Sequence, residues 1–309
     1  MKKQIAVILG PTATGKSHCG IALAQALDGE IISGDSMLVY RGMDIGTAKP
    51  TAEELALVPH HMVDILPPEA SFNVVDFKER AERLIEEITA RGKLPIIVGG
   101  TGLYIKALLE DYKFSSKGED SALRAELEEL LAEQGKEALY ARLEKSAPAE
   151  AGKIDINNTR RVIRAIEAAE SGDDLSHSKS EELVYDAAVF GLRMERSVLY
   201  ERINCRVDIM LEQGLIEETR RLLEKRVPES AQSMQAIGYR QTVLYLKGEW
   251  DKATAVDKIK QATRNFAKRQ FTWYKKMPYV KWFNLDAEPN YGNVTAEMIK
   301  TVVEKFKIG

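Results

Sequence analysis

The chain has 309 residues, of which 44% are hydrophobic and 29% charged, and its formal net charge is −3. These values are typical of a globular protein of about two domains, and the charge balance predicts no chain-wide nucleic-acid-binding surface. No apolar run approaches the roughly 20 residues that span a bilayer, and the N-terminus lacks the apolar stretch of a signal peptide. Because Cys19 and Cys205 are the only cysteines, we expect a cytoplasmic protein with no membrane partner and no disulfide framework.

The first predicted strand, 5–9, runs into a glycine-rich loop, and a predicted helix over 17–27 follows. The loop reads Gly10-Pro-Thr-Ala-Thr-Gly15-Lys16-Ser17 and fits the pattern G-x-x-x-x-G-K-[ST]. A strand, a glycine loop and a helix in this order form a phosphate-binding loop. We expect a diphosphate or triphosphate to be held by Gly10, Thr12, Ala13, Thr14, Gly15, Lys16 and Ser17, with Mg²⁺ at Ser17. A turn that binds nothing is the alternative.

Short apolar strands alternate with helices up to residue 110. The predicted strands are 30–33, 62–65 and 94–98, and the predicted helices are 73–91 and 102–109. This alternation predicts an α/β fold with a P-loop NTPase-like parallel sheet flanked by helices. Ser33-Gly-Asp-Ser36 and Gly99-Gly-Thr-Gly102 follow two of the strands, so we expect them to meet the phosphate-binding loop in one cleft. The glycine-punctuated loop 42–50 is of the kind that shapes a site or moves over one.

Residues 111–185 differ in composition and predict an inserted all-helical subdomain. Leucines recur at helical spacing, and Asn157-Asn158 caps a helix that carries Arg160 and Arg164 one turn apart. The segment 115–184 contains ten basic and sixteen acidic residues. Any contact with RNA would therefore use a local basic face, such as the one formed by Lys153 with Arg160, Arg161 and Arg164.

A strand over 186–192 returns the chain to the core, which we assign to 1–110 and 186–309. Helices are predicted over 196–212, 215–225, 238–247, 252–274 and 294–306, and a last strand over 279–284. Residues 251–281 contain nine Lys or Arg against two Asp, with Trp273, Tyr274, Tyr279 and, just beyond, Trp282 interleaved. Basic residues beside aromatic rings suit phosphate contact and base stacking, although a solvated helix face has the same composition.

The carboxylates decide what kind of phosphate chemistry the cleft supports. A kinase needs a metal-holding Asp at the end of a later strand, but the 94–98 strand ends in glycine. Asp64, at the end of the predicted 62–65 strand, keeps the kinase alternative open. Asp35 follows another strand, where it either caps an Asx turn or accepts a proton from an attacking N–H or O–H group. The pair His60-His61 suits a loop or the placing of a phosphate better than a metal site.

Two further residues have no clear role when each is considered alone. Thr101 lies in a loop whose glycines permit close backbone approach, and Arg206 lies on the helix after the returning strand. Arginine suits bidentate contact with diphosphate oxygens, but an isolated arginine on a helix is more typical of a surface ion pair.

Several segments together resemble the bacterial tRNA dimethylallyltransferases. They are 10–17, Asp35-Ser-Met37, 40–50, His60-His61, Gly99-Gly-Thr-Gly-Leu-Tyr104, 160–164, 235–240 and Thr263-Arg264 to Lys268-Arg-Gln-Phe-Thr-Trp273. The resemblance covers residues 5 to about 275, and Ile45–Pro50 and Lys268–Trp273 are its most specific parts. It implies transfer of a dimethylallyl group from dimethylallyl diphosphate to N6 of adenine 37 in the anticodon stem-loop of tRNA, by a monomer that uses Mg²⁺.

The resemblance also implies roles for individual residues. Asp35, Thr101 and Arg206 match catalytic positions, with Asp35 as the general base. The positions that match tRNA-binding stretches are Asp35, Ser36, Met37, Leu38, Thr101, Arg124, Arg160, Arg161, Arg164, Gln235, Gly238, Tyr239, Arg240, Arg264 and Lys268. One departure is Leu38, where the family usually has Gln; a leucine packs against a base but cannot read its edge. A small-molecule kinase and an isopentenyltransferase acting on free adenine nucleotides are the alternatives.

Overall fold

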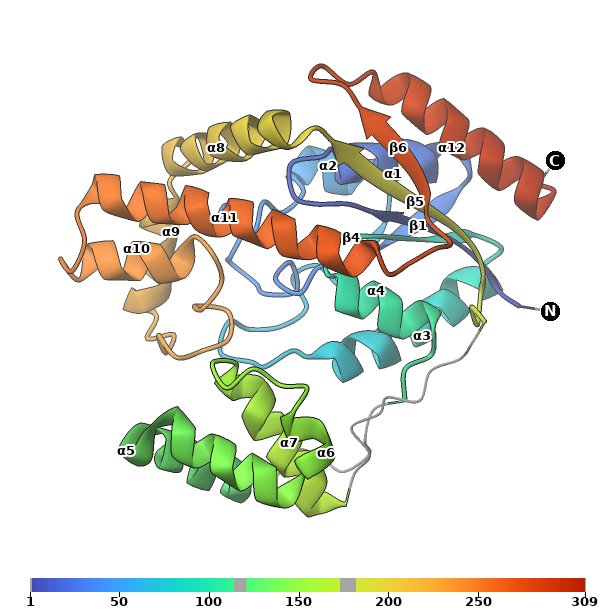
Figure 1. Cartoon of the computed structure of the whole chain (residues 1–309). Coiled ribbons are helices and arrows are strands. Elements are labelled where there is room, and N and C mark those ends of the chain that lie inside the picture. Colours follow the sequence, from blue (N-terminus) through green and yellow to red (C-terminus); the bar gives the residue numbers. More distant parts are fainter. Residues whose placement is uncertain (1, 114–120, 173–181, 309) are drawn as a thin grey trace. The chain divides into compact units, whose positions relative to one another are not determined.

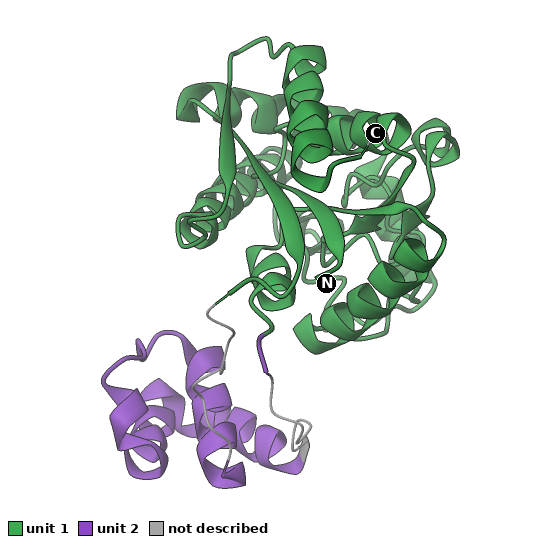
Figure 2. Ribbon diagram, turned by 90° about the vertical axis from the view of Figure 1, so that its right-hand side faces the viewer, with its two compact units in different colours: residues 1–111, 182–309 green, residues 112–181 purple. Residues whose placement is uncertain are grey.

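The computed structural model describes residues 2–113, 121–172 and 182–308. The chain forms two compact units, Met1–Asp111 with Glu182–Gly309, and Tyr112–Glu181 (Figure 2). The second unit is an insertion in the first, since the chain leaves the first unit after Asp111 and returns to it at Glu182. Residues 114–120 and 173–181 of the predicted insert lie outside the described residues.

The first unit is built on a six-stranded parallel sheet with the strand order β3-β2-β4-β1-β5-β6 (Figure 1). The first strand in the chain therefore lies inside the sheet, and later strands lie on both sides of it. The strands are β1 (Gln4–Leu9), β2 (Gly29–Ser33), β3 (His60–His61), β4 (Leu94–Gly99), β5 (Asp186–Met194) and β6 (Lys281–Leu285). This topology confirms the predicted P-loop NTPase-like α/β core.

Both faces of the sheet are buried because alternate residues of each strand enter different hydrophobic clusters. In β1, Ile5, Val7 and Leu9 pack in one cluster, and Ala6 and Ile8 pack in the other. Helices α3 (Val74–Ala90) and α4 (Gly102–Leu109) contribute to the first cluster, and α1 (Lys16–Ala26) and α12 (Tyr291–Phe306) to the second. Burial on both faces explains why the strands read as continuous apolar runs.

The helices of the first unit lie close to their predicted bounds. They are α1 (Lys16–Ala26), α2 (Ala52–Leu57), α3 (Val74–Ala90), α4 (Gly102–Leu109), α8 (Arg196–Glu212), α9 (Leu215–Glu224), α10 (Tyr239–Leu246), α11 (Lys252–Tyr274) and α12 (Tyr291–Phe306). Helix α2 was not predicted, although Thr51 and Glu54 form a capping box at its N-terminus.

The second unit consists of α5 (Ser121–Ser146), α6 (Pro148–Ala151) and α7 (Thr159–Ser171). Gly135, with a φ of 83°, interrupts α5. Leu127, Leu139 and Leu143 of α5 pack with Ile166 of α7 in a separate core. As predicted, an asparagine caps α7, because the Asn158 side chain accepts a hydrogen bond from the N–H group of Arg161. This unit therefore has its own hydrophobic core.

Two predicted boundaries were wrong. The strand expected over 62–65 is the two-residue strand β3, because Met62 and Asp64 adopt positive φ angles (62° and 56°) and turn the chain away from the sheet. Residues 182–185, which we had assigned to the insert, belong to the first unit. There the Val184 N–H group donates to the Leu109 carbonyl at 3.1 Å.

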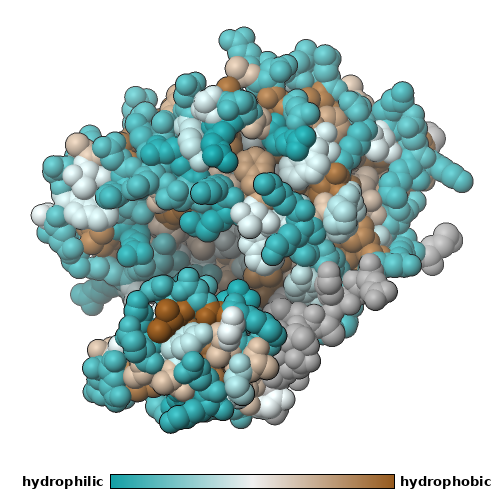
Figure 3. Space-filling model, viewed as in Figure 1, coloured by the Kyte–Doolittle hydropathy of each residue, from teal (hydrophilic) through white to brown (hydrophobic). Residues whose placement is uncertain are grey.

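Within the described part of the chain, no helix is long and apolar enough to cross a membrane. On the face seen in Figure 3, hydrophilic side chains cover most of the first unit, and apolar residues form only small groups.

Candidate active site

A cleft of about 760 Å³ opens at the carboxyl ends of the central strands of the first unit. Three segments that follow strands line it: the loop after β1, Asp35 after β2, and Gly99-Gly100 at the end of β4. Loop 42–50, α2 and α8 complete the wall. The predicted convergence of the three polar segments on one cleft is confirmed. The volume lies in the usual range for small-molecule sites.

The phosphate-binding loop is held by its carbonyl groups. Tyr274 donates to the Gly10 carbonyl (3.0 Å), and Thr14 and Lys16 both donate to the Pro11 carbonyl (2.8 Å each). Arg202 donates to the Ala13 carbonyl (3.0 Å). Tyr291 donates to the Thr14 carbonyl (3.3 Å) and packs so closely on Gly15 that any Cβ there would lie 2.4 Å from its ring.

Because the carbonyl groups are engaged, the N–H groups of the loop are available for a ligand. Among the described residues, the N–H groups of Ala13, Thr14 and Gly15 have no hydrogen-bond partner, and those of Lys16 and Ser17 are the unpaired donors of the first turn of α1. Thr12 is different, since its N–H group donates to Gln270 (3.2 Å). A row of unpaired N–H groups at a helix N-terminus binds anions. The predicted phosphate site therefore has the required donors, except at Thr12.

Two cations face this cleft without a carboxylate partner among the described residues. Lys16 donates only to the Pro11 carbonyl of its own loop, and Arg206 lines the cleft from α8. The pKa of Lys16 is lowered to about 8, mainly because its ammonium group is buried. The nearby charge of Arg206 also lowers this pKa, and its effect is larger than the opposite effect of Asp35. Burial likewise lowers the pKa of Arg206. Both side chains are half-buried, so an anion bound between them would offset the cost of keeping them charged.

Asp35 lies in the same cleft and has two functions open to it. One carboxylate oxygen accepts a hydrogen bond from the Met37 N–H group at 2.8 Å, so the predicted Asx turn is present. Among the described residues, the other carboxylate oxygen has no hydrogen-bond partner, and the side chain lines the cleft. The turn therefore fixes the carboxylate while one oxygen stays available for a substrate proton.

Thr101 lies directly behind this turn. Its hydroxyl accepts a hydrogen bond from the Ser36 N–H group (3.2 Å), and its own N–H group donates to the Gly34 carbonyl (3.2 Å). Thr101 therefore joins the segments after β2 and β4. Leu38 lines the cleft, whereas Ser36 and Met37 are half-buried beside it.

The site has no kinase-like carboxylate at the positions considered from the sequence. The end of β4 is Gly99, where any Cβ would lie 2.3 Å from the Gly34 backbone. Asp64, which we had placed at the end of a strand, lies in a turn instead and forms an ion pair with Lys49. Backbone packing therefore excludes a metal-holding Asp at the first position, and Lys49 occupies the second.

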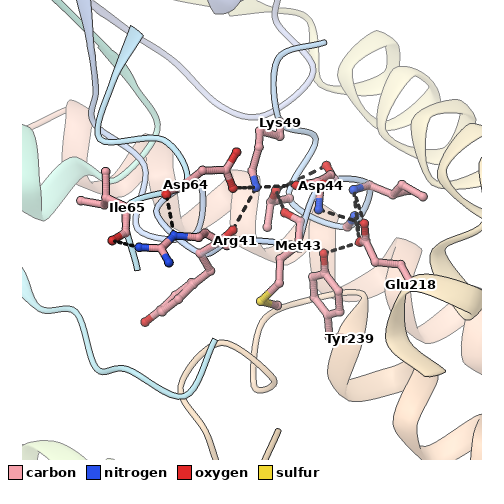
Figure 4. A network of polar contacts seen from close by, with 12 residues as sticks. Arg41, Met43, Asp44, Lys49, Asp64, Ile65, Glu218 and Tyr239 are labelled. Carbon is pink, nitrogen blue, oxygen red and sulfur yellow. Dashed lines mark hydrogen bonds and ion pairs between the residues drawn. The ribbon is translucent and has the colours of Figure 1, made fainter. Parts of the chain in front are cut away.

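Loop 42–50 is fixed by a polar network in which Glu218 of α9 is the central acceptor (Figure 4). The carboxylate of Glu218, which is 3% exposed, accepts the N–H groups of Asp44 (2.9 Å), Ile45 (2.9 Å) and Gly46 (3.1 Å). Tyr239 donates to it at 2.5 Å. At the other end of the loop, Lys49 binds Asp44, Asp64 and the Tyr40 carbonyl. This wall of the cleft is therefore held in place by contacts within the protein.

The network corrects two of the predicted tRNA contacts. The Tyr239 side chain is fully buried and its hydroxyl belongs to Glu218, so it is not a surface contact. Gly238, with a φ of 99°, is also buried and allows the turn into α10. Gln235 and Arg240 of the same stretch are exposed, and so is Lys268 of α11, whereas Arg264 is half-buried and donates to Asn204 at 2.6 Å.

The arginines of the second unit are partly used within it. Arg124 makes two 2.8 Å hydrogen bonds with Glu167, a buried carboxylate in α7. Arg164 lies 3.7 Å from the same carboxylate, and Arg160 and Arg161 are at the N-terminal end of α7. Arg124 therefore serves the packing of α5 on α7, and Arg160, Arg161 and Arg164 are the more accessible part of the predicted basic face.

The histidine pair does not belong to the cleft. His60 and His61 form β3, where His61 bonds to Glu30 at 2.7 Å and His60 to the Val58 carbonyl at 2.8 Å. The prediction of a phosphate-placing loop at these residues was wrong. Among the described residues, no group of three His, Cys, Asp or Glu side chains could hold a metal ion.

Sequence reasoning missed the residues that support the phosphate-binding loop from a distance. Arg202, Gln270, Tyr274 and Tyr291 come from α8, α11 and α12 and contact the loop across at least 189 positions of sequence. The only available signal was the polar Gln270 at a position of α11 that helical periodicity assigns to the buried face.

Comparisons with known proteins show the family of this chain. A family model described as IPP transferase matches residues 38–277. The tRNA dimethylallyltransferases of Bacillus cytotoxicus and Bacillus anthracis are each 46% identical to this chain over 99% of its length, and the matches cover 97% and 98% of their own lengths.

Solved structures give the same result. The tRNA isopentenylpyrophosphate transferase of Bacillus halodurans is 43% identical, with a TM-score of 0.73 and 99% of each chain covered. A eukaryotic dimethylallyltransferase acting on tRNA is 27% identical, with a TM-score of 0.75 and 97% of this chain and 78% of that chain covered. The chain therefore belongs to the IPP transferase family.

Proposed function

We propose that this protein transfers a dimethylallyl group from dimethylallyl diphosphate to N6 of adenine 37 in tRNA and releases diphosphate. The observation that carries the proposal is the presence, in one cleft, of two cations and a carboxylate beside a phosphate-binding loop. Among the described residues, neither cation has a carboxylate partner, and one oxygen of the carboxylate has no hydrogen-bond partner. The cations suit a diphosphate leaving group, and the carboxylate suits an N–H nucleophile. The names of the relatives and their coverage support this assignment.

On this proposal, the donor's diphosphate binds the N–H groups of the loop, Lys16 and Arg206. As the allylic C–O bond breaks, the electron pair leaves with the diphosphate, and these preorganised donors stabilise the added charge. The free oxygen of Asp35 accepts the N6 proton as the new C–N bond forms. The Thr101 hydroxyl accepts the Ser36 N–H group and thereby holds the turn that carries Asp35.

Mg²⁺ is part of the proposal. The Ser17 hydroxyl belongs to the first turn of α1 and lines the cleft, and its oxygen is a donor that fits a hard cation. Mg²⁺ takes few protein ligands and fills its remaining positions with phosphate oxygens and water, so the donor's diphosphate would complete the site. When bound, it would neutralise charge on the leaving diphosphate.

The acceptor must reach the cleft as an unstacked base, because N6 is inaccessible within a stack. Loop nucleotides cost least to unstack, which favours the anticodon stem-loop. Exposed Gln235, Arg240 and Lys268, half-buried Arg264, and the basic end of α7 are the proposed RNA contacts. The proposal also includes a cytoplasmic monomer, where tRNA is available.

The direct test is to incubate the protein with labelled dimethylallyl diphosphate, Mg²⁺ and either unmodified tRNA or AMP. We expect label in tRNA and none in AMP. Label in AMP alone would identify an enzyme of free nucleotides. Phosphate transfer from ATP to a small acceptor, with no transfer of label, would identify a kinase.

The role of α7 gives a second test. Replacing both Arg160 and Arg164 with Ala should weaken tRNA binding and reduce the slope of log K against log salt by about 1 to 2, because each lost phosphate contact removes about one unit. Binding would be measured by filter retention at salt concentrations from about 50 to about 200 mM. Replacing Lys93 and Lys300 of the first unit with Ala deletes the same charge outside the second unit and serves as the control. An unaltered slope in the Arg160/Arg164 variant would mean that this face is merely solvated.

A further inference from the structure

The phosphate-binding loop and the glycine loop after β4 carry different halves of the proposed reaction. The first holds the leaving diphosphate, and the second carries Thr101, which fixes the turn of Asp35. Strands β1 and β4 are neighbours, with Leu9 paired to Gly99, so the sheet fixes where both loops begin. Beyond the strands, both loops are rich in glycine, and the sheet no longer sets the distance between them.

Helix α11 connects the two loops through a buried amide. The Gln270 side chain is 4% exposed. Its NH₂ group donates to the Gly100 carbonyl at 2.9 Å, and its carbonyl oxygen accepts the Thr12 N–H group at 3.2 Å. One carboxamide therefore satisfies a donor on one loop and an acceptor on the other, which no charged or hydroxyl side chain of this length does in the same geometry.

Tyr274, one turn further along α11, makes the same connection a second time. Its buried hydroxyl lies 3.0 Å from the Gly10 carbonyl and 2.8 Å from the Gly100 carbonyl. Since a hydroxyl has one proton, it is shared between these two acceptors and holds both loops at one distance.

The glycines of the second loop allow α11 to come this close. A Cβ at Gly100 would lie 2.4 Å from the Gln270 amide nitrogen, and a Cβ at Gly102 would lie 2.5 Å from the Cβ of Trp273. The close approach of α11 to this loop therefore requires glycine at both positions. Because the Thr12 N–H group donates to Gln270, it is not available to the ligand. This part of the phosphate-binding loop instead fixes the loop relative to α11.

We propose that Gln270 and Tyr274 are positioning residues that set the distance between the leaving diphosphate and the acceptor amine. The inference rests on the proposed function. An allylic cation formed beside a well-placed amine is captured by that amine. If the two loops separate, water can enter and capture the cation instead: the C–O bond to diphosphate breaks, water oxygen bonds to the allylic carbon, and one proton goes to solvent. The side product is dimethylallyl alcohol.

The test measures both products from one labelled donor in the presence of saturating tRNA and Mg²⁺. The ratio of alcohol to prenylated tRNA does not depend on how much enzyme is folded, so a purely structural defect leaves it unchanged. For Gln270→Glu, which keeps the acceptor for Thr12 but loses the donor to Gly100, and for Tyr274→Phe, we expect the ratio to rise at least about tenfold, and kcat for prenylation to fall about 10- to 100-fold. The KM for tRNA should stay the same.

Tyr279→Phe is the matched control, because it also deletes one tyrosine hydroxyl bond, to Glu110 at 3.0 Å, but outside the cleft. Its product ratio should equal that of the wild type. An unchanged ratio in both Gln270→Glu and Tyr274→Phe would overturn the positioning role while leaving the proposed function intact. A wild-type enzyme that makes no prenylated tRNA would overturn the proposed function and, with it, this inference.

Discussion

Replacement of Asp35 by Ala is expected to lower the single-turnover rate of prenyl transfer by about 10²- to 10⁴-fold, the range found for loss of a general base. The reason is the oxygen of Asp35 that the Asx turn leaves free and that faces the cleft. An adenine amine is a weak nucleophile, since its lone pair is delocalised into the ring, and it gains nucleophilicity as its proton is accepted. Rapid-quench measurement with enzyme in excess over tRNA isolates this step.

Asp35→Asn is the control that separates the two functions of this side chain. The amide oxygen of the variant still accepts the Met37 N–H group, so the turn is kept, whereas the amide cannot accept a proton. We expect the Asp35→Asn enzyme to be nearly as slow as the Ala variant and to bind tRNA with the affinity of the wild type. Near-normal single-turnover rates in Asp35→Asn would reduce Asp35 to a turn cap. Loss of tRNA binding with an unchanged rate would assign it to recognition.

The phosphate-binding loop and Asp35 could be predicted because their determinants are local. A contiguous pattern of eight residues places the N–H groups, Lys16 and Ser17, and a parallel sheet brings the ends of its strands together whatever the helices do. The cleft could therefore be located before the structure was known.

The supports of the loop could not be predicted, because each depends on a tertiary contact. Nothing near Gln270 in the sequence indicates that its amide meets Thr12 and Gly100, and the basic residues around it suggested an RNA-binding face alone. The predicted tRNA contact of Tyr239 was wrong for the same reason. Its neighbours Gln235 and Arg240 are exposed, but the turn at Gly238 directs the Tyr239 ring inward to Glu218.

The strand predicted at 62–65 shows a different limit. The segment Met62-Val-Asp-Ile65 is a short, mostly apolar run, which is typical of a buried strand. Positive φ angles at Met62 and Asp64 end β3 after two residues, and the ion pair of Asp64 with Lys49 uses the polar residue of the pattern. A backbone turn that is stabilised by a lysine from another loop cannot be predicted from the local pattern of apolar residues.

Replacement of Lys16 by Ala is expected to lower kcat/KM for dimethylallyl diphosphate by about 10²- to 10³-fold, as for removal of one preorganised donor to a developing anion. The pH dependence gives a sharper result. Burial and the charge of Arg206 lower the pKa of Lys16 to about 8, and kcat/KM reports the free enzyme. Below this pKa the ammonium is charged and binds the diphosphate. Above it, kcat/KM should fall, approaching about tenfold for each pH unit.

Lys16→Arg provides the reference for this profile, because a guanidinium stays charged throughout the range. The donor and Mg²⁺ titrate equally in both enzymes, so the ratio of wild-type to Arg-variant kcat/KM isolates the ionisation of Lys16. That ratio should be constant from about pH 6 to about pH 7.5 and fall above about pH 8. A ratio that stays constant to about pH 9.5 would mean that Lys16 keeps its charge over this range and that its pKa is not lowered in the free enzyme. Lys16 would then act on the leaving diphosphate as a fixed charge, as Arg206 does.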